Sequence, residues 1–293
     1  MKLFWSFICL MAFTLGQAQS TANRFFYELK YKPSTQSDSI RQAMTILDIL
    51  PEKSIYRDEL MISQDSLLKA EVEKMMKTGA FKDLSKSIKK PNFSYKVIKT
   101  YPSMEIRYTD HILQDKVSYD EKLLFDWKIF PEKKKIGEYN AQKATSSFAG
   151  RNYTAWFSNE LPFQDGPYKF FGLPGLIVQL EDETGDYQWT LKGNKKVDNH
   201  EEESYSEKLM KQFGQSRNEI KVSKEKFEQM YEAYKKDPFG SIRHQISQIP
   251  AEAKMPDGTS ISKMMKEQEE QMKKHLNEND NTIEIRKTDK NKK

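Results

Sequence analysis

As far as Lys195, the chain is dominated by short stretches in which apolar and polar residues alternate. From Tyr27 to Lys32, aromatic or apolar residues take every second position, which is typical of a strand with one buried face. Most of these stretches are separated by short connections, which favours antiparallel pairing over strands joined by helices. We expect strands over residues 25–32, 44–50, 53–58, 93–98, 104–108, 117–119, 123–130, 145–148, 153–157, 176–180 and 187–192.

Helical spacing replaces this alternation in one insertion and in the last third of the chain. Leu68, Val72 and Met75 share one helical face, with Asp65 as the expected N-cap and Gly79 as the expected stop. Further helices are expected over 205–213, from 223 to just before 238, and over 261–276. The pattern predicts an α+β fold: a curved, half-barrel-like antiparallel β-sheet whose concave face is covered by inserted and C-terminal helices.

The first residues have the pattern of a secretory signal. Lys2 precedes an apolar stretch over 3–15, and Gly16 and Ala18 offer small residues for cleavage after Ala18. This stretch is shorter than the ~20 residues of a spanning helix. We therefore expect an exported protein, periplasmic or extracellular, that does not span a membrane after cleavage. The expected divisions are a signal peptide (1–18), a β-rich core (19–195), a helical region packed on or extending from it (196–286) and a disordered charged tail (287–293).

Composition narrows the chemistry. The net charge of +5 is small and the two signs interleave, whereas a nucleic-acid-binding protein gathers positive charge on one face. Cys9 is the single cysteine and leaves with the signal, so the mature chain forms no disulfide. The sequence has no Gly-x-Ser-x-Gly elbow or glycine-rich phosphate loop. Its dispersed histidines form no local zinc motif. We predict no catalytic residue, no metal site and no cofactor.

One segment departs from the alternation: residues 172–177, with the sequence Gly-Leu-Pro-Gly-Leu-Ile. Two glycines around a proline, followed by an apolar run, predict a shaped turn that enters a buried strand. The segment contains no acid, base or nucleophile, so we interpret it as fold-determining. The residues assigned to this structural motif are Gly166, Pro167, Gly172, Leu173, Pro174, Gly175, Leu176 and Ile177.

This segment and its surroundings resemble the GLPGLI family of exported bacterial proteins. The similarity includes the Gly-Arg-Asn-Tyr-Thr-Ala-Trp sequence at 150–156, Leu161-Pro162 and Gly-Pro-Tyr-Lys-Phe at 166–170. It is scattered elsewhere, for example at 281–285, where Thr282 stands at a position often taken by proline. The resemblance implies export and a β-rich fold, and it implies no reaction.

Arg151 is the charged residue embedded in this family-like segment. On a strand, Tyr153 and Phe157 share one face and Trp156 points to the other. In one interpretation Arg151 is structural, stacked on a ring or holding a carboxylate such as Asp165. In the other, these five residues line an aromatic cleft in which Arg151 binds an anionic group.

Three functional hypotheses remain. The first is a non-enzymatic binding or carrier protein of the cell envelope with a small apolar ligand. The alternative is an interaction module that docks on an outer-membrane transport receptor or a secretion machine. The third is a hydrolase built on Asp165, Arg151 and a distant histidine. In addition, Ser39 and Ser66 each follow an aspartate and precede an apolar residue, which resembles a short O-glycosylation signal.

Overall fold

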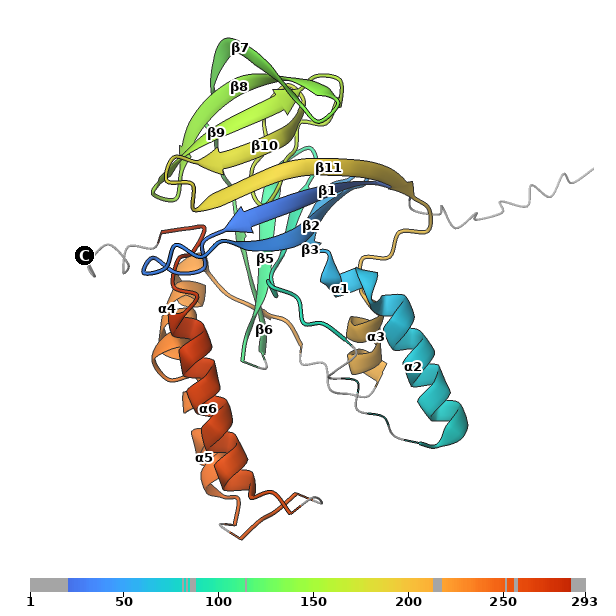
Figure 1. Cartoon of the computed structure of the whole chain (residues 1–293), viewed down its shortest axis with the longest axis vertical. Coiled ribbons are helices and arrows are strands. Elements are labelled where there is room, and N and C mark those ends of the chain that lie inside the picture. Colours follow the sequence, from blue (N-terminus) through green and yellow to red (C-terminus); the bar gives the residue numbers. More distant parts are fainter. Residues whose placement is uncertain are drawn as a thin grey trace, which may run out of the picture.

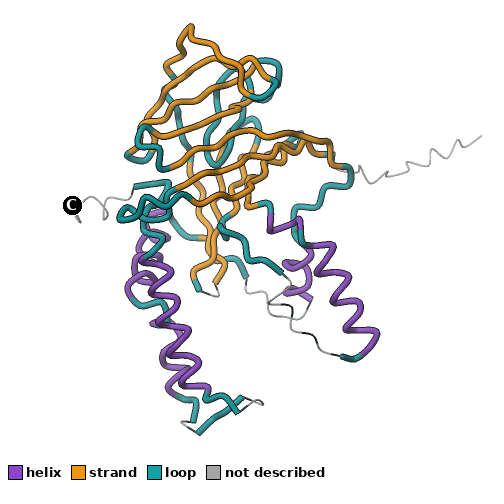
Figure 2. The backbone as a smooth tube through the Cα atoms, viewed as in Figure 1, coloured by secondary structure: helices purple, strands orange, loops and turns teal. Residues whose placement is uncertain are grey.

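The computed structural model of the chain describes residues 21–285, except 81, 83, 85–87, 114, 213–217, 251, 256 and 257. The expected signal peptide (1–18) and charged tail (287–293) lie outside this part. Within it, strands form the body of the molecule and helices flank them (Figure 2).

Twelve strands form one sheet, in the order β12-β6-β5-β4-β3-β2-β1-β11-β10-β9-β8-β7. Neighbours are antiparallel, except that the short β12 runs parallel to β6. The sheet bends strongly between β7–β10 and β4–β6 (Figure 1), which confirms the expected α+β fold with a curved sheet. The strands are β1 (Ala22–Tyr31), β2 (Arg41–Ile49), β3 (Lys53–Asp58), β4 (Lys96–Thr100), β5 (Glu105–Ile112), β6 (Asp115–Glu121), β7 (Lys128–Ile136), β8 (Tyr139–Phe148), β9 (Arg151–Ser158), β10 (Leu176–Asp182), β11 (Tyr187–Val197) and β12 (Ile220–Lys221).

The helices form two groups that lie apart in Figure 1. One group is α1 (Leu60–Ser63), α2 (Asp65–Thr78) and α3 (Tyr205–Gln212); the other is α4 (Lys224–Lys236), the short 3-10 turn η1 (Gly240–Ile242), α5 (Arg243–Ser247) and α6 (Ile261–Asn277). In the first group α2 contacts α3, and in the second α4 contacts β5 and β6.

The expected helix boundaries are largely correct. Gly79 ends α2 in the left-handed conformation, and the Ser223 hydroxyl accepts a hydrogen bond from the Lys226 backbone as the N-cap of α4. The N-cap of α2 is Gln64, so the expectation for Asp65 is wrong by one position. Asp65 instead begins the helix and accepts a hydrogen bond from the backbone of Tyr205.

The expected strand over 123–130 is wrong, because β7 begins only at Lys128. The preceding residues use their side chains for packing instead of alternating across a strand. Phe125 lies 5.3 Å from Phe170 and 5.2 Å from Phe171, measured between ring centres. The Trp127 indole nitrogen donates to the carbonyl of Phe171.

The core lies between one face of the sheet and the long connection from β9 to β10. We call this face the aromatic face, and the β9–β10 connection comprises residues 159–175. Phe170 of the connection is fully buried, with its ring centre 4.6 Å from Tyr153 and 6.4 Å from Trp189. The aromatic face is marked by Tyr27, Tyr56, Tyr108, Tyr153 and Trp189, all buried.

Candidate functional site

Arg151 begins β9 and is buried among polar groups. One guanidinium nitrogen lies 2.6 Å from Asp182 Oδ2 and 3.0 Å from Asp186 Oδ2. The other donates to Asn281 Oδ1 at 2.6 Å and to the Thr282 carbonyl at 3.0 Å. Burial alone would lower the pKa of Arg151, but Asp186 and Asp182 outweigh it and raise that pKa. The guanidinium therefore ties β9 to the β10–β11 turn and to the segment after α6.

Asp165 belongs to a different ion pair. It lies in the β9–β10 connection and pairs with Lys99 of β4, and both side chains are buried. Asp165 also accepts hydrogen bonds from the Tyr101 hydroxyl and, at 2.7 Å, from the Gly166 backbone. Lys99 donates to the Gly166 carbonyl at 2.8 Å. Burial lowers the pKa of Lys99, and Asp165 acts against that shift. The pair fixes the connection on the sheet.

The three aromatic candidates on β9 divide between the two faces of the sheet. Tyr153 and Phe157 are buried on the aromatic face. Trp156 faces the other way, where the Lys134 ammonium lies 4.1 Å from its ring centre. The five candidate residues from the sequence are thus spread over separate environments and do not converge on one cleft.

The glycines of the structural motif lie where the β9–β10 connection approaches the sheet closely. Gly175 has a φ of +153°, and a Cβ atom there would lie 2.3 Å from the Ser158 carbonyl oxygen. A Cβ on Gly166 would lie 2.7 Å from Ile177 Cδ1. β10 begins directly after the motif turn, at Leu176. This half of the aromatic face has no space for an additional atom at those positions.

A second buried ion cluster lies on the same face, towards β6. The Lys169 ammonium contacts Glu121 and Glu284 and donates to the Tyr119 hydroxyl at 2.8 Å. Lys224 of α4 reaches the same two carboxylates at 2.8 Å and 2.9 Å. Although burial alone would raise it, the pKa of Glu284 is held at about 2 by Lys169 and Lys224. Two ammonium groups and two carboxylates balance one another here.

Beside this cluster is a cavity of about 210 Å³. It is partly open to solvent, and it is lined by the aromatic face on one side, and by α4, the end of α6 and residues 281–284 on the other. Successive rings along it are in contact, with centres 5.0 to 5.6 Å apart. These rings, which we call the aromatic wall, belong to Tyr31, Phe93, Tyr95, Tyr108, Tyr119 and Phe227.

The polar groups of the cavity include a buried carboxyl group, Asp110 of β5, which is 8% exposed. It accepts hydrogen bonds from Ser94 Oγ at 2.5 Å, the His111 backbone at 2.7 Å and the Tyr108 hydroxyl at 3.2 Å. Burial raises the pKa of Asp110, and these hydrogen bonds oppose the shift. The neighbouring Tyr95 hydroxyl is buried; it makes no hydrogen bond of regular geometry within the described part of the chain, and its polar neighbour is the Tyr56 hydroxyl.

Arg151 contacts the residues that line this cavity. Asn281 and Thr282, its hydrogen-bond partners, both line it, as does Tyr187, whose ring centre lies 5.2 Å from the guanidinium carbon. The backbone of Asn281 also donates to the carbonyl of Pro33. Arg151 does not line the cavity itself. It is a positioning residue that fixes Asn281 and Thr282, which form part of the cavity wall.

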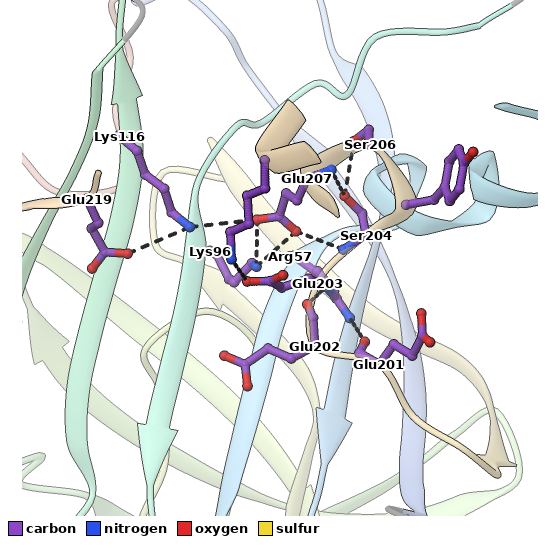
Figure 3. A network of polar contacts seen from close by, with 12 residues as sticks. Arg57, Lys96, Lys116, Glu201, Glu202, Glu203, Ser204, Ser206, Glu207 and Glu219 are labelled. Atoms are coloured by element: carbon purple, nitrogen blue, oxygen red, sulfur yellow. Dashed lines mark hydrogen bonds and ion pairs between the residues drawn. The ribbon is translucent and has the colours of Figure 1, made fainter. Parts of the chain in front are cut away.

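The opposite face of the sheet carries a different polar network (Figure 3). Arg57 contacts Asp48 at 3.3 Å and donates to the Glu202 carbonyl at 2.7 Å. Figure 3 shows the Glu207 carboxylate next to Lys96, from which it lies 3.1 Å away. Although burial alone would raise it, Lys96 and its neighbours hold the pKa of Glu207 at about 2. These contacts fasten α3 and the segment before it to the sheet.

The described residues contain neither a metal-binding cluster nor a membrane-spanning helix. No group of three or more His, Cys, Asp or Glu side chains there is arranged to hold a metal ion. No helix in the same residues is both long and apolar enough to cross a membrane.

Part of the chain is similar to a known protein family. Residues 147–179 match a family described as "Protein of unknown function (Porph_ging)". This match covers the motif, all of β9 and the first part of β10. No curated protein matches the chain.

Solved structures of PNGF-II, in the C2 and P21 space groups, are similar to this chain in part. They are 14% identical to it, with TM-scores of 0.48 and 0.47, and they cover 72% and 73% of this chain. The chain in turn spans about a third of their length, 32% and 33%.

Sequence analysis did not single out Asp110, Lys99 or Lys169. A signal for Asp110 was present: Ile106, Tyr108 and Asp110 occupy every second position, so a carboxyl group falls on an apolar face. The expected strand ended at Tyr108, two residues before Asp110, and this hid the pattern.

Proposed function

We propose that this protein is an exported, non-enzymatic binding or carrier protein of the cell envelope. Its ligand is a small molecule with an apolar body that occupies the cavity against the aromatic wall. The observation that supports this most directly is the cavity itself, about 210 Å³, which is bordered by the C-terminal helices and residues 281–284. Ligand sites are typically concave and aromatic-lined, with a few polar groups that fix orientation.

Export and membership of the GLPGLI family are parts of the same proposal. The signal-like residues 1–18 and the Gly-Leu-Pro-Gly-Leu-Ile sequence support them. Expression in a bacterial host, followed by fractionation and intact mass, tests export. A periplasmic or released protein that begins at Gln19 is the expected result, and a full-length cytoplasmic chain would contradict it.

Binding is tested on the mature protein by native mass spectrometry and by thermal shift against a panel of small neutral, cationic and anionic compounds. We expect a retained or added ligand that raises the melting temperature. Leu276 of α6 lines the cavity and is half-buried, so Leu276→Trp fills part of the space. It should weaken binding at least about tenfold, a change of about 1.4 kcal/mol in binding free energy.

Gln271→Trp is the matched control, because Gln271 is exposed on the same helix and lies outside the cavity lining. It should bind as the unchanged protein does. If no ligand is retained and no compound shifts the melting temperature, the proposal fails.

A second function is favoured by a different observation. The α5–α6 arm extends away from the sheet in Figure 1, and α6 has no fully buried residue. Ion pairs of Arg243 with Glu269 and Asp237 hold the arm together. This surface is suited to docking on an outer-membrane transport receptor. Crosslinking in intact cells should then recover that receptor, and recovery of this protein alone would count against docking.

A further inference from the structure

The cavity lining contains more acidic than basic side chains. Its lining includes three carboxyl groups, Asp110, Glu228 and Glu284, and one imidazole, His275. All of its lining residues lie in the described part of the chain, and no lysine or arginine is among them. The cavity therefore offers negative charge without a positive side chain of its own.

Glu284 is already neutralised, because Lys169 and Lys224 share it with Glu121. Glu228 is only half-buried, on α4, where water can solvate it. Asp110 remains as the deeply buried carboxyl group of the cavity.

All of the hydrogen bonds that Asp110 accepts come from neutral donors, namely Ser94 Oγ, the His111 backbone and the Tyr108 hydroxyl. A buried carboxylate is stabilised most by an opposite charge. The site thus has room for one cation that the chain itself does not supply there.

The aromatic wall suits the same kind of charge. The faces of tyrosine and phenylalanine rings attract ammonium groups, and the attraction is strongest where water is excluded. This fold already uses these rings in that way: the Lys169 ammonium lies 4.8 Å from the ring centre of Tyr108 and 5.1 Å from that of Tyr119.

We infer that the ligand carries an ammonium group, which binds beside Asp110 and against the rings of the aromatic wall. This inference rests on the proposed binding function and names the chemical class of the ligand: an organic cation with a small apolar body. In such a site the rings hold the apolar substituents on nitrogen, and Asp110 supplies the opposite charge.

The test uses three probes of similar shape and different charge. They are choline, its neutral analogue 3,3-dimethylbutan-1-ol, and the anion 3,3-dimethylbutanoate, titrated into the mature protein by calorimetry or by NMR. Choline should bind at least about tenfold more tightly than the alcohol. The anion should bind most weakly.

Two variants connect this preference to the site. Asp110→Asn should reduce the choline-to-alcohol ratio severalfold, since the shape is kept and the charge is removed, and the ring contacts retain only part of the preference. Asp120→Asn is its control, a carboxyl group on the exposed face of β6 that pairs with Arg107; it should leave the ratio unchanged. Tyr231→Leu removes a half-buried ring of the cavity and should weaken choline binding even if Asp110→Asn does not fold.

The outcomes separate the two proposals. If the alcohol binds as tightly as choline and Leu276→Trp weakens both, the cavity is a binding site but the ammonium inference is wrong. Choline binding that Asp110→Asn and Tyr231→Leu leave unchanged also overturns the inference. If nothing binds and the mature protein retains no ligand, the proposed binding function fails as well.

Discussion

The two ends of the aromatic face differ in how they are filled. Around β9 and β10, the connection over 159–175 packs so closely that Gly175 has no space for a Cβ atom. Around β4, β5 and β6, the same face leaves a cavity, and among the described residues Asp110 has hydrogen-bond donors there but no lysine or arginine of the kind that Lys99 provides for Asp165. The recognisable sequence motif thus marks the part that must pack tightly. The less tightly packed part is where a ligand can bind.

The largest expected effect tests the tightly packed end. Gly175→Ala introduces a Cβ atom 2.3 Å from a backbone oxygen, at a φ of +153°. Strain and overpacking together should lower the free energy of unfolding by about 5 kcal/mol. Urea titration measures this. Gly185→Ala is the control, since Gly185 has a φ of +68° but open space around it, and should lose about 1–2 kcal/mol. If both variants lost the same free energy of unfolding, the close approach of Gly175 to the Ser158 carbonyl would not contribute to stability.

The next effect concerns the buried Lys99–Asp165 pair. Lys99→Met leaves the Asp165 carboxylate buried without its cation, and should lower the free energy of unfolding by about 3–4 kcal/mol. The double variant Lys99→Met/Asp165→Asn should be more stable than Lys99→Met alone, because no uncompensated charge remains. Thermal or urea unfolding of the single and double variants gives the coupling. If the stability loss of the double variant equalled the sum of the losses of the two single variants, Lys99 and Asp165 would not be energetically coupled.

The third prediction concerns pH at the border between the two ends. The pKa of Glu284 is about 2 in the folded protein and 4.5 for a free side chain. A lowered carboxyl pKa stabilises the fold above pH 4.5, and this contribution is lost as the pH falls towards 2. Glu284→Gln should therefore be less stable than the wild type at pH 7 by about 2–3 kcal/mol. Urea unfolding at several pH values should show the gap closing on acidification; a gap that is constant with pH would exclude this ion cluster as its cause.

The smallest expected effect is the loss of one tyrosine hydroxyl from the aromatic face, which we compare at two positions. The Tyr56 hydroxyl accepts a hydrogen bond from the Trp189 indole at 2.8 Å, so Tyr56→Phe should lower stability by about 1–3 kcal/mol. The Tyr95 hydroxyl makes no hydrogen bond of regular geometry in the described residues, so Tyr95→Phe should leave stability within about 0.5 kcal/mol or raise it. Paired melting curves decide this, and a loss at Tyr95 as large as at Tyr56 would show that its hydroxyl is satisfied.

The sequence predicted those strands, helices and turns whose signals lie in neighbouring residues of the chain. Alternation and turn residues located β10 from Leu176 and the end of α2 at Gly79, because such signals depend on neighbours in the chain. The structural interpretation of Arg151 also had a local basis, although its carboxylate partners are Asp182 and Asp186. Asp165 was not identifiable as a partner of Lys99 because 66 positions of chain separate them.

The candidate site was beyond such reasoning. Its cavity depends on the distance between strands β4–β6 and helix α4, and no short pattern encodes an unfilled volume. The wall that Asn281 and Thr282 contribute depends on Arg151, which lies far from them in the sequence. The placement of Asp110 among alternating apolar residues was a usable signal for the site, but the expected strand ended at Tyr108 and left it out.

The wall formed by residues 281–284 has a consequence for the order in which the protein matures. These residues are synthesised after all twelve strands, so every strand can pair while the cavity is still open on that side. A nascent or truncated chain that lacks them exposes the rings of the aromatic wall to water and to chaperones. Under the proposed binding function, a shortened product that lacks residues 281–284 would form the sheet and still fail to retain a ligand.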